Sequence, residues 1–182
     1  MDGSGTGVAG ERPIYLIGMM CCGKSTVGRL LATRLGLPFI DLDRMIEDRV
    51  GPLLPFVQRE GEEAFRAVES EVLAEADSWP RSVIATGGGT PTVPGNLEIM
   101  RKSGTLIWLD VPMHALMPRI ERAGGDRPLL FGLRGDALLE RVRELLEARS
   151  RVYALATFRI PGDGTPDEVA ARIAHALDDQ RK

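Results

Sequence analysis

Residues 14–26 read IYLIGMMCCGKST, and this stretch decides the fold. Its first four residues are apolar and are followed by a glycine, which predicts a strand buried on both faces. From Lys24 onward the apolar positions follow a helical period that includes Val27 and Leu31, and Gly36 stands where helices commonly end. The stretch therefore predicts a buried strand, a turn and a helix in direct succession.

The turn between strand and helix matches the phosphate-binding pattern G-x-x-x-x-G-K-[ST]. In such a loop the backbone N–H groups and the helix N-terminus face the phosphates of a nucleotide. The lysine reaches the β- and γ-phosphates, and the serine hydroxyl binds Mg²⁺. A glycine-containing turn with a surface lysine is the alternative. We expect an ATP or GTP site formed by Gly18, Cys21, Cys22, Gly23, Lys24, Ser25 and Thr26.

Strand and helix patterns alternate along the rest of the chain, which is typical of an α/β fold whose parallel sheet carries helices on both faces. We expect strands at 14–17, 37–40, 83–86, 105–109 and 158–160, and helices at 24–35, through 45–49, at 62–79, 136–153 and 166–177. A further helix after 105–109 should be kinked or shortened by Pro118, because proline lacks the N–H that a helix interior needs.

The chain reads as one domain over residues 12–182, preceded by a flexible tail at 1–11. The tail is rich in glycine, serine and threonine and lacks the apolar stretch of a signal peptide. Residues 122–135 contain glycines, a proline and arginines without a sustained period, which predicts a mobile loop.

The composition excludes several classes of protein. The 182 residues carry 23 basic and 26 acidic side chains, and the net charge of −3 argues against a nucleic-acid binder. No apolar stretch approaches the length of about 20 residues that spans a bilayer. The two cysteines are adjacent, which offers no disulfide framework and favours the cytoplasm.

Two carboxylates follow the second expected strand. In an extended chain Asp41 and Asp43 project to the same side, at the edge of the sheet where α/β proteins bind ligands. One carboxylate can hold Mg²⁺ through water while the other accepts a proton from the hydroxyl that is phosphorylated. For Asp43 a helix-capping role is the alternative.

Three consecutive glycines, 87–89, follow the third expected strand. Glycine weakens regular structure, so such a run indicates close approach of a ligand to the backbone, with a plain loop as the alternative. Arg66 lies on the inward-facing side of its helix and needs an anionic partner there. That partner is either the carboxylate of a substrate or one of Glu62, Glu63 and Glu69.

Two further arginines are candidates for binding anionic groups. Arg127 lies in the expected mobile loop and suits a lid that brings a cation to the transferred phosphoryl group, with a solvated arginine as the alternative. Arg149 precedes Tyr153 by one helical turn, and its alternative role is a surface salt bridge with Glu147 or a nearby aspartate. Neither His114 nor His175 has an evident chemical partner.

Together these motifs resemble the shikimate kinase family from Ile14 to about Leu177. The family transfers the γ-phosphoryl group of ATP to the 3-hydroxyl of shikimate, on the route to chorismate and the aromatic amino acids. The most specific matches are Gly-Glu-Glu-Ala-Phe-Arg at 61–66, Thr-Gly-Gly-Gly at 86–89 and Arg-Pro-Leu-Leu at 127–130. The phosphate loop, Asp41-Leu42-Asp43 and Arg149 ahead of Tyr153 agree with them.

The resemblance implies the P-loop kinase fold of the nucleoside-monophosphate-kinase type, a three-layer α/β/α arrangement with strand order 2-3-1-4-5. It implies a substrate-binding region at about 41–66 and a lid at about 123–135. It further implies a monomer that uses Mg²⁺ with ATP as co-substrate.

The resemblance also implies roles for individual residues. Asp43 binds the shikimate hydroxyls and accepts the proton, and Asp41 and Ser25 hold Mg²⁺. Lys24 and Arg127 stabilise charge on the transferred group. Shikimate itself is bound by Asp43, Arg66, Gly87, Gly88, Gly89 and Arg149.

The sequence departs from the family pattern in the phosphate loop, where Cys21 and Cys22 replace a glycine and a small residue. A side chain at position 21 strains the loop if that position needs a positive φ. Either two small side chains simply fit there, or oxidation of a cysteine blocks nucleotide binding. Pro52 and Pro55 are expected to shorten the helix before Gly61.

Two other functions remain as alternatives. A kinase of another small hydroxy acid such as gluconate shares the phosphate loop and the aspartate but does not need the residues at 86–89 and 127–130. A catalytically silent nucleotide-binding relative is expected to lack Lys24, Asp43 or an arginine, and the sequence retains them all.

Overall fold

The structure is a computed structural model that describes residues 12–124 and 127–180. Five parallel strands form one sheet in the order β2-β3-β1-β4-β5, as the family resemblance implied. The strands are β1 (Ile14–Ile17), β2 (Phe39–Asp41), β3 (Val83–Ala85), β4 (Thr105–Asp110) and β5 (Phe158–Pro161). The helices are α1 (Lys24–Leu35), α2 (Leu42–Val50), α3 (Leu53–Ala74), α4 (Asn96–Ser103), α5 (Met113–Ala123), α6 (Gly135–Tyr153) and α7 (Pro166–Asp179).

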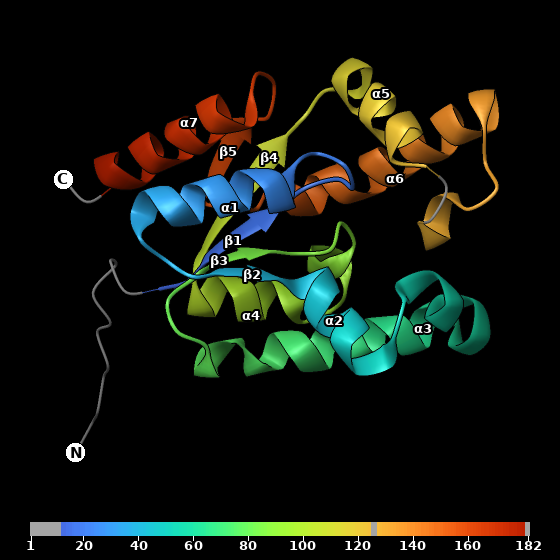
Figure 1. The fold of residues 1–182 in the computed structure, drawn as a ribbon, viewed down its shortest axis with the longest axis horizontal. Helices are drawn as coiled ribbons and strands as arrows, with labels where there is room; N and C mark the ends of the chain where they lie inside the picture. Colours follow the sequence, from blue (N-terminus) through green and yellow to red (C-terminus); the bar gives the residue numbers. More distant parts are fainter. Residues whose placement is uncertain (1–11, 125–126, 181–182) are drawn as a thin grey trace.

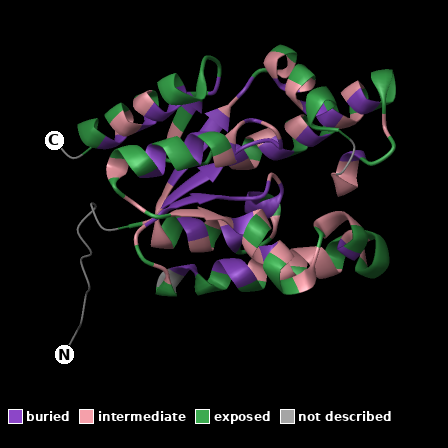
Figure 2. Ribbon diagram, viewed as in Figure 1, coloured by how far each residue is buried: buried purple, intermediate pink, exposed green. Residues whose placement is uncertain are grey.

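Helices cover both faces of the sheet, which gives the expected three layers (Figure 1). The alternation of side chains along β1 explains how: Leu16 packs in a core cluster with residues of α1, α6 and α7, whereas Tyr15 and Ile17 pack in a second cluster with residues of α3 and α4. The central strands β1, β3 and β4 are therefore buried on both faces, and exposed residues lie mainly on the outer sides of the helices (Figure 2).

The phosphate loop joins β1 to α1 as the sequence predicts. The helix begins at Lys24, directly after Gly23, and ends before Gly36, whose φ of 64° places it in the left-handed region. Glycine has no Cβ and adopts this conformation without strain, so it terminates the helix at the predicted residue.

Helix α3 differs from the prediction. It begins at Leu53, so Pro52 and Pro55 do not shorten it. Pro52 lies just outside its first turn and Pro55 within it, where a backbone N–H has no intrahelical partner to lose. Gly61, with φ 90° and ψ 167°, breaks the helix into two parts, and the second part ends at Ala74 rather than at residue 79.

Other parts of the chain also correct the prediction. Helix α4, at 96–103, was not predicted, because eight residues are too few to show a sustained period. Helix α5 runs through Pro118 to Ala123, so the proline does not end it. A 3₁₀ turn, Pro128–Leu130, lies in the expected mobile loop.

The tail at 1–11 lies outside the described residues, as do residues 125–126 of the expected lid. Among the helices of the described residues, none has the length and apolar character needed to span a membrane.

Candidate active site

A cavity of about 1140 Å³ opens at the carboxyl ends of β1, β2 and β3. The phosphate loop and the candidate acceptor-binding residues both contribute to its walls. Ser25 and Arg149, more than 120 positions apart in the sequence, therefore line the same cavity. The candidate residues that line the cavity are Ser25, Asp41, Asp43, Arg66, Gly87, Gly88, Gly89, Arg127 and Arg149.

The phosphate loop lies at one side of this cavity and is tightly packed. Gly18 has a φ of 138°, and a Cβ placed there would lie 2.8 Å from the carbonyl oxygen of Leu109. Lys24 is only 8% exposed, and its Nζ donates hydrogen bonds to the carbonyl oxygens of Gly18 and Met19, each at 2.9 Å. The lysine ammonium is therefore held against the loop that precedes it. Thr26, by contrast, is exposed on α1.

The two loop cysteines occupy different environments. Cys21 has a φ of 60°, the one positive φ at a non-glycine residue of the described chain, so the conformational strain expected at this position is present. Cys22 is buried, and its Sγ accepts a hydrogen bond from Lys24 Nζ at 3.7 Å. Both thiols are free.

The expected arrangement of the two aspartates was wrong in one respect. Asp41 ends β2, but α2 begins at the next residue, so Asp43 lies in the first turn of a helix and not in an extended chain. The rule that residues two apart face the same way in a strand therefore does not apply. Both carboxylates nevertheless line the cavity. The capping residue of α2 is Asp41, not Asp43, and no side chain caps this helix.

The environment of Asp43 favours its protonated form. Burial, assisted by the nearby charges of Glu69 and Asp41, raises the pKa of this carboxyl to about 6, although Lys24 and Arg127 act in the opposite direction. A carboxyl with a pKa near neutrality can accept a proton and later release it.

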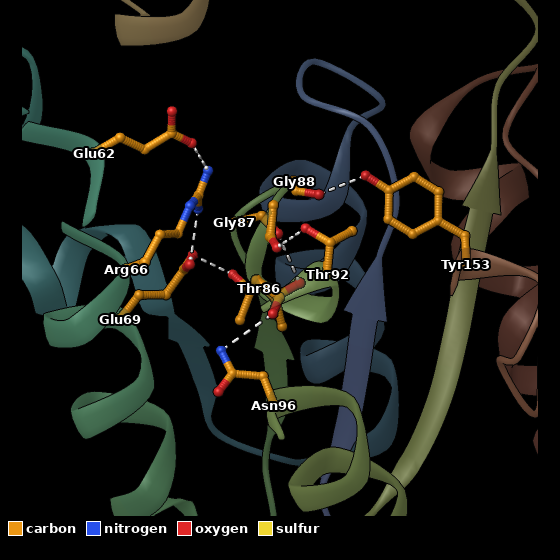
Figure 3. A network of polar contacts seen from close by, with 11 residues as sticks. Glu62, Arg66, Glu69, Thr86, Gly87, Gly88, Thr92, Asn96 and Tyr153 are labelled. Atoms are coloured by element: carbon orange, nitrogen blue, oxygen red, sulfur yellow. Dashed lines mark hydrogen bonds and ion pairs between the residues drawn. The ribbon is translucent and has the colours of Figure 1, made fainter. Parts of the chain in front are cut away.

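Arg66 lies on the second part of α3 and is held by two acids of the same helix (Figure 3). Its Nη2 donates to Glu62 at 3.0 Å and its Nη1 donates to Glu69 at 2.8 Å. The burial of Arg66 lowers its pKa, but these two carboxylates more than offset this effect, so the net pKa is raised. The alternative of an ion pair within the helix is thus realised for Glu62 and Glu69, and the guanidinium still lines the cavity.

Arg149 is only 6% exposed, which excludes the surface salt bridge considered from the sequence. It extends from α6 toward the phosphate loop, where its Nη1 lies 3.9 Å from the sulfur of Met19. Arg127 lines the same cavity, and its positive charge is among those that act on the pKa of Asp43.

The three glycines are favoured by limited space rather than by backbone conformation, since none of them has a positive φ. A Cβ on Gly87 would lie 2.9 Å from Asp43 Oδ1, and one on Gly89 would lie 2.5 Å from Arg66 Nη2. Real Cβ atoms do not approach other atoms this closely. The absence of side chains at 87–89 therefore allows the charged residues of the cavity to reach the backbone of this loop.

The sequence did not identify three polar residues that shape the site. Glu69, fully buried, was named only as a possible partner of Arg66, yet it also accepts a hydrogen bond from the Thr90 hydroxyl. Arg119 donates to the carbonyl oxygen of Cys22 at 3.2 Å and to that of Gly162 at 3.4 Å, joining the phosphate loop to the segment after β5.

The third of these residues is Tyr153, whose hydroxyl donates a hydrogen bond to Gly88. Local periodicity holds no signal for it or for Arg119, because their partners lie 43 to 97 residues away in the sequence. For Glu69 a signal existed, since the spacing of three residues from Arg66 puts both on one helix face.

Comparisons with known proteins agree with this geometry. The family model described as shikimate kinase matches residues 20–178. The shikimate kinase of Gloeobacter violaceus is 46% identical over 168 residues, covering 90% of this chain and 91% of the relative. A solved structure of shikimate kinase from Acinetobacter baumannii in complex with shikimate superposes with a TM-score of 0.86 at 35% identity, covering 93% and 94% of the two chains.

A gluconokinase from Sinorhizobium meliloti also superposes, with a TM-score of 0.59 and 19% identity over 94% of this chain and 98% of that one, which shows a shared fold alone. The extent of the matches to shikimate kinases, together with a cavity lined by Ser25 of the phosphate loop and by Asp43, Arg66 and Arg149, places this chain in the shikimate kinase family.

Proposed function

We propose that the protein transfers the γ-phosphoryl group of ATP to the 3-hydroxyl of shikimate, giving shikimate 3-phosphate and ADP on the route to chorismate. The observation that carries the proposal is the meeting of two arginines and an aspartate with the phosphate loop around one cavity, in a member of the shikimate kinase family. This combination suits a small acceptor that carries both a carboxylate and hydroxyl groups.

The acceptor is bound by charged side chains and by the backbone of residues 87–89, which we call the glycine loop. Arg66 and Arg149 approach the loop from α3 and α6, on the evidence of their closeness to Gly89 and Gly88. Guanidinium groups pair with carboxylates through two parallel hydrogen bonds, so these arginines grip the carboxylate of shikimate. Asp43, next to Gly87, then receives the ring hydroxyls.

The transfer itself requires positioning and charge stabilisation. Asp43 accepts the proton of the 3-hydroxyl while that oxygen forms a bond to the γ-phosphorus, and the bond from this phosphorus to the bridging oxygen of ADP breaks. Lys24 exchanges its two carbonyl partners for phosphate oxygens, and together with Arg127 it stabilises the charge on the transferred group.

The residues present fit a magnesium ion. Mg²⁺ prefers oxygen ligands, keeps several waters and is held by one or two protein groups together with substrate phosphates. Ser25 and Asp41 offer a hydroxyl and a carboxylate on the same cavity, and the described residues hold no cluster of three or more ligands for a fully protein-bound metal. We propose that these two residues hold Mg²⁺, which neutralises phosphate charge when bound.

The two alternative functions have less support. A gluconate kinase does not require the Thr86–Gly89 and Arg127–Leu130 segments, and the likeness to a gluconokinase extends only to the fold. A silent relative would lack part of the machinery, but Lys24, Asp43 and the arginines are all present. The adjacent cysteines at 21 and 22 are the one feature in its favour.

The test is ADP release from the purified protein with Mg·ATP and shikimate, gluconate or no acceptor, with ³¹P NMR to identify the product. We expect release that depends on shikimate, and the variant Asp43→Asn should lose turnover while it retains ATP binding. If no acceptor stimulates release although ATP binds, the silent relative becomes the better reading. Retained turnover in the variant would remove Asp43 from the role of proton acceptor.

We also propose that the protein acts as a cytoplasmic monomer. Free thiols at 21 and 22 suit a reducing compartment, and one chain supplies all of the proposed site residues. Sedimentation velocity at micromolar concentration should give the mass of a single chain, and a stable dimer would contradict this part of the proposal.

A further inference from the structure

Tyr153 contacts the glycine loop without lining the cavity. It is the last residue of α6, is fully buried, and its ring packs 5.9 Å from the ring of Trp108. Its hydroxyl donates a hydrogen bond of 2.5 Å to the carbonyl oxygen of Gly88, 65 residues away in the sequence (Figure 3). A buried aromatic ring thus ends in a polar group that meets the backbone of the site and lies beside the Arg149 guanidinium.

Gly88 is the point where the glycine loop meets two other parts of the site. A Cβ at this position would lie 3.1 Å from the backbone nitrogen of Met20 and 3.3 Å from Arg149 Nη1. The phosphate loop and the guanidinium proposed to bind the acceptor therefore both adjoin this glycine. A displacement of Gly88 by a few tenths of an ångström would therefore change its distance to the phosphate loop, to the Arg149 guanidinium or to both.

Arg149 and Tyr153 lie one helical turn apart on α6, and both are buried. The same helix therefore places the Arg149 guanidinium at the cavity and holds the adjacent backbone of Gly88 through Tyr153. Burial, outweighing the nearby charge of Arg149, raises the pKa of Tyr153 well above its usual value, so the hydroxyl remains a hydrogen-bond donor throughout the pH range in which the protein works.

Independent contacts hold the other side of the loop. Thr86 donates to the carbonyl oxygen of Leu16, Asn96 donates to that of Thr90, and the Thr90 hydroxyl donates to the buried Glu69. These contacts fasten the loop to β1, α4 and α3. The bond from Tyr153 adds α6 to this set, on the side where Arg149 lies.

We infer that Tyr153 is a positioning residue for the acceptor: its hydroxyl holds Gly88 at the spacing from Arg149 and from the phosphate loop that shikimate requires. The inference rests on the proposed function for its effect on catalysis. Its structural part, that the hydroxyl orders residues 86–92, does not depend on which reaction is catalysed.

The chain offers a matched control, because its only two tyrosines are both fully buried and both hydrogen-bonded through the hydroxyl. Tyr15 pairs with Ser103 at 2.8 Å, on the helix α4 and away from the cavity. Tyr153→Phe and Tyr15→Phe each remove one buried hydroxyl and keep the ring. Urea unfolding of both variants measures the general cost of that removal.

In steady-state kinetics we expect Tyr153→Phe to raise the KM for shikimate about tenfold, the effect of losing one well-placed hydrogen bond, with the KM for ATP within about twofold of the unchanged protein. Tyr15→Phe should change neither constant. Equal changes for both substrates, or the same changes in both variants, would reduce Tyr153 to a structural residue and overturn the inference.

Hydrogen exchange measured by mass spectrometry on the whole protein supplies a readout that needs no turnover. Peptides covering residues 86–92 should exchange faster in Tyr153→Phe than in the unchanged protein and no faster in Tyr15→Phe. Unchanged exchange would overturn the inference even if shikimate proved to be the substrate. Faster exchange in a protein that does not phosphorylate shikimate would support the ordering of residues 86–92 by the hydroxyl and reject the proposed function.

Discussion

At the scale of single residues, the charge of Asp43 depends on a balance among its neighbours. Burial and two other carboxylates favour the protonated form, whereas Lys24 and Arg127 favour the ionised form, and the result is a pKa of about 6. A proton acceptor must be ionised before it can act. The balance therefore places the change in its charge just below neutral pH.

This pKa predicts the pH dependence of the reaction. Because the pKa is raised, Asp43 is protonated below about pH 6, so kcat/KM for shikimate should fall roughly tenfold per pH unit there and level off above pH 7. The profile is measured between pH 5 and 8 at saturating Mg·ATP, with the KM for ATP followed as a control. An inflection near pH 4 would mean that Asp43 titrates as an ordinary carboxyl.

Cys21 shows how a single residue can be strained at a functional loop. Its positive φ costs an L-amino acid about 1–2 kcal/mol, while glycine adopts the conformation freely but loses more entropy on folding. Cys21→Gly should therefore raise the free energy of unfolding by about 0.5–1 kcal/mol net.

Cys21→Ala is the matched control for this variant, because it removes the thiol and keeps the strain. Urea unfolding should leave Cys21→Ala close to the unchanged protein. A gain as large as that of Cys21→Gly would show that the thiol, and not the backbone, is the cause.

At the scale of elements, the break in α3 separates two functions. The part before Gly61 borders the cavity with apolar residues, and the part after it carries Glu62, Arg66 and Glu69 on one face. The backbone conformation of Gly61, with φ 90° and ψ 167°, belongs to a region that is essentially restricted to glycine. The direction from which Arg66 enters the cavity therefore depends on this glycine.

Gly61→Ala tests this dependence. A Cβ at this position meets no atom within 4 Å, so the cost comes from backbone conformation alone, about 1–3 kcal/mol of unfolding free energy. We expect that loss together with a severalfold rise in the KM for shikimate and an unchanged KM for ATP. Gly36→Ala, at the end of α1, serves as control: it should lose stability without affecting either KM.

The elements also show what could be predicted from the sequence. The phosphate loop and the helix after it follow from a motif and a period that act over a few residues, and they were predicted correctly. The strand order was implied by the family resemblance, not by local pattern, and it is confirmed. The short helix at 96–103 and the early start of α3 were not, because eight residues carry too few repeats and two prolines suggested an interruption. The position of Asp43 in a helix was missed because the end of β2 was placed by pattern alone.

The candidate site was predicted as a set of residues but not as a set of contacts. The charged residues stand in recognisable motifs, and Asp41, Asp43, Arg66, Arg127 and Arg149 all line the cavity, whereas Lys24 does not. The hydrogen bonds that position these residues, such as those from Thr90 to Glu69 and from Tyr153 to Gly88, join segments that are distant in the sequence. Such contacts leave no periodic trace in one sequence.

At the scale of the whole molecule, the site joins helices from opposite faces of the sheet. Side chains from α2, α3 and α6 line the cavity, so a ligand that binds there links parts of the fold that unfolding must separate. A ligand that binds only the folded state stabilises it by a free energy that rises with the logarithm of its concentration relative to its Kd.

Shikimate should therefore raise the melting temperature of the protein. At a concentration of about 100 times its Kd the added stability is about 2.7 kcal/mol, which corresponds to a rise of about 5–10 °C for a chain of this size. Differential scanning calorimetry with shikimate, with Mg·ADP and with gluconate measures the effect. A rise with gluconate equal to that with shikimate would contradict the proposed acceptor.

The packing around the glycine loop has a consequence for redesigning this protein toward other acceptors. A side chain introduced at 87 or 89 must displace Glu69 and Asp43 or Arg66, and one at 88 presses on the phosphate loop and Arg149, that is, on groups a new acceptor would still need. New selectivity is more readily introduced at Leu53, Leu54 and Val57, apolar residues that border the cavity from the first part of α3. In a mutant library, variation at the glycines should yield mostly inactive proteins, and variation along the first part of α3 should yield changed preferences.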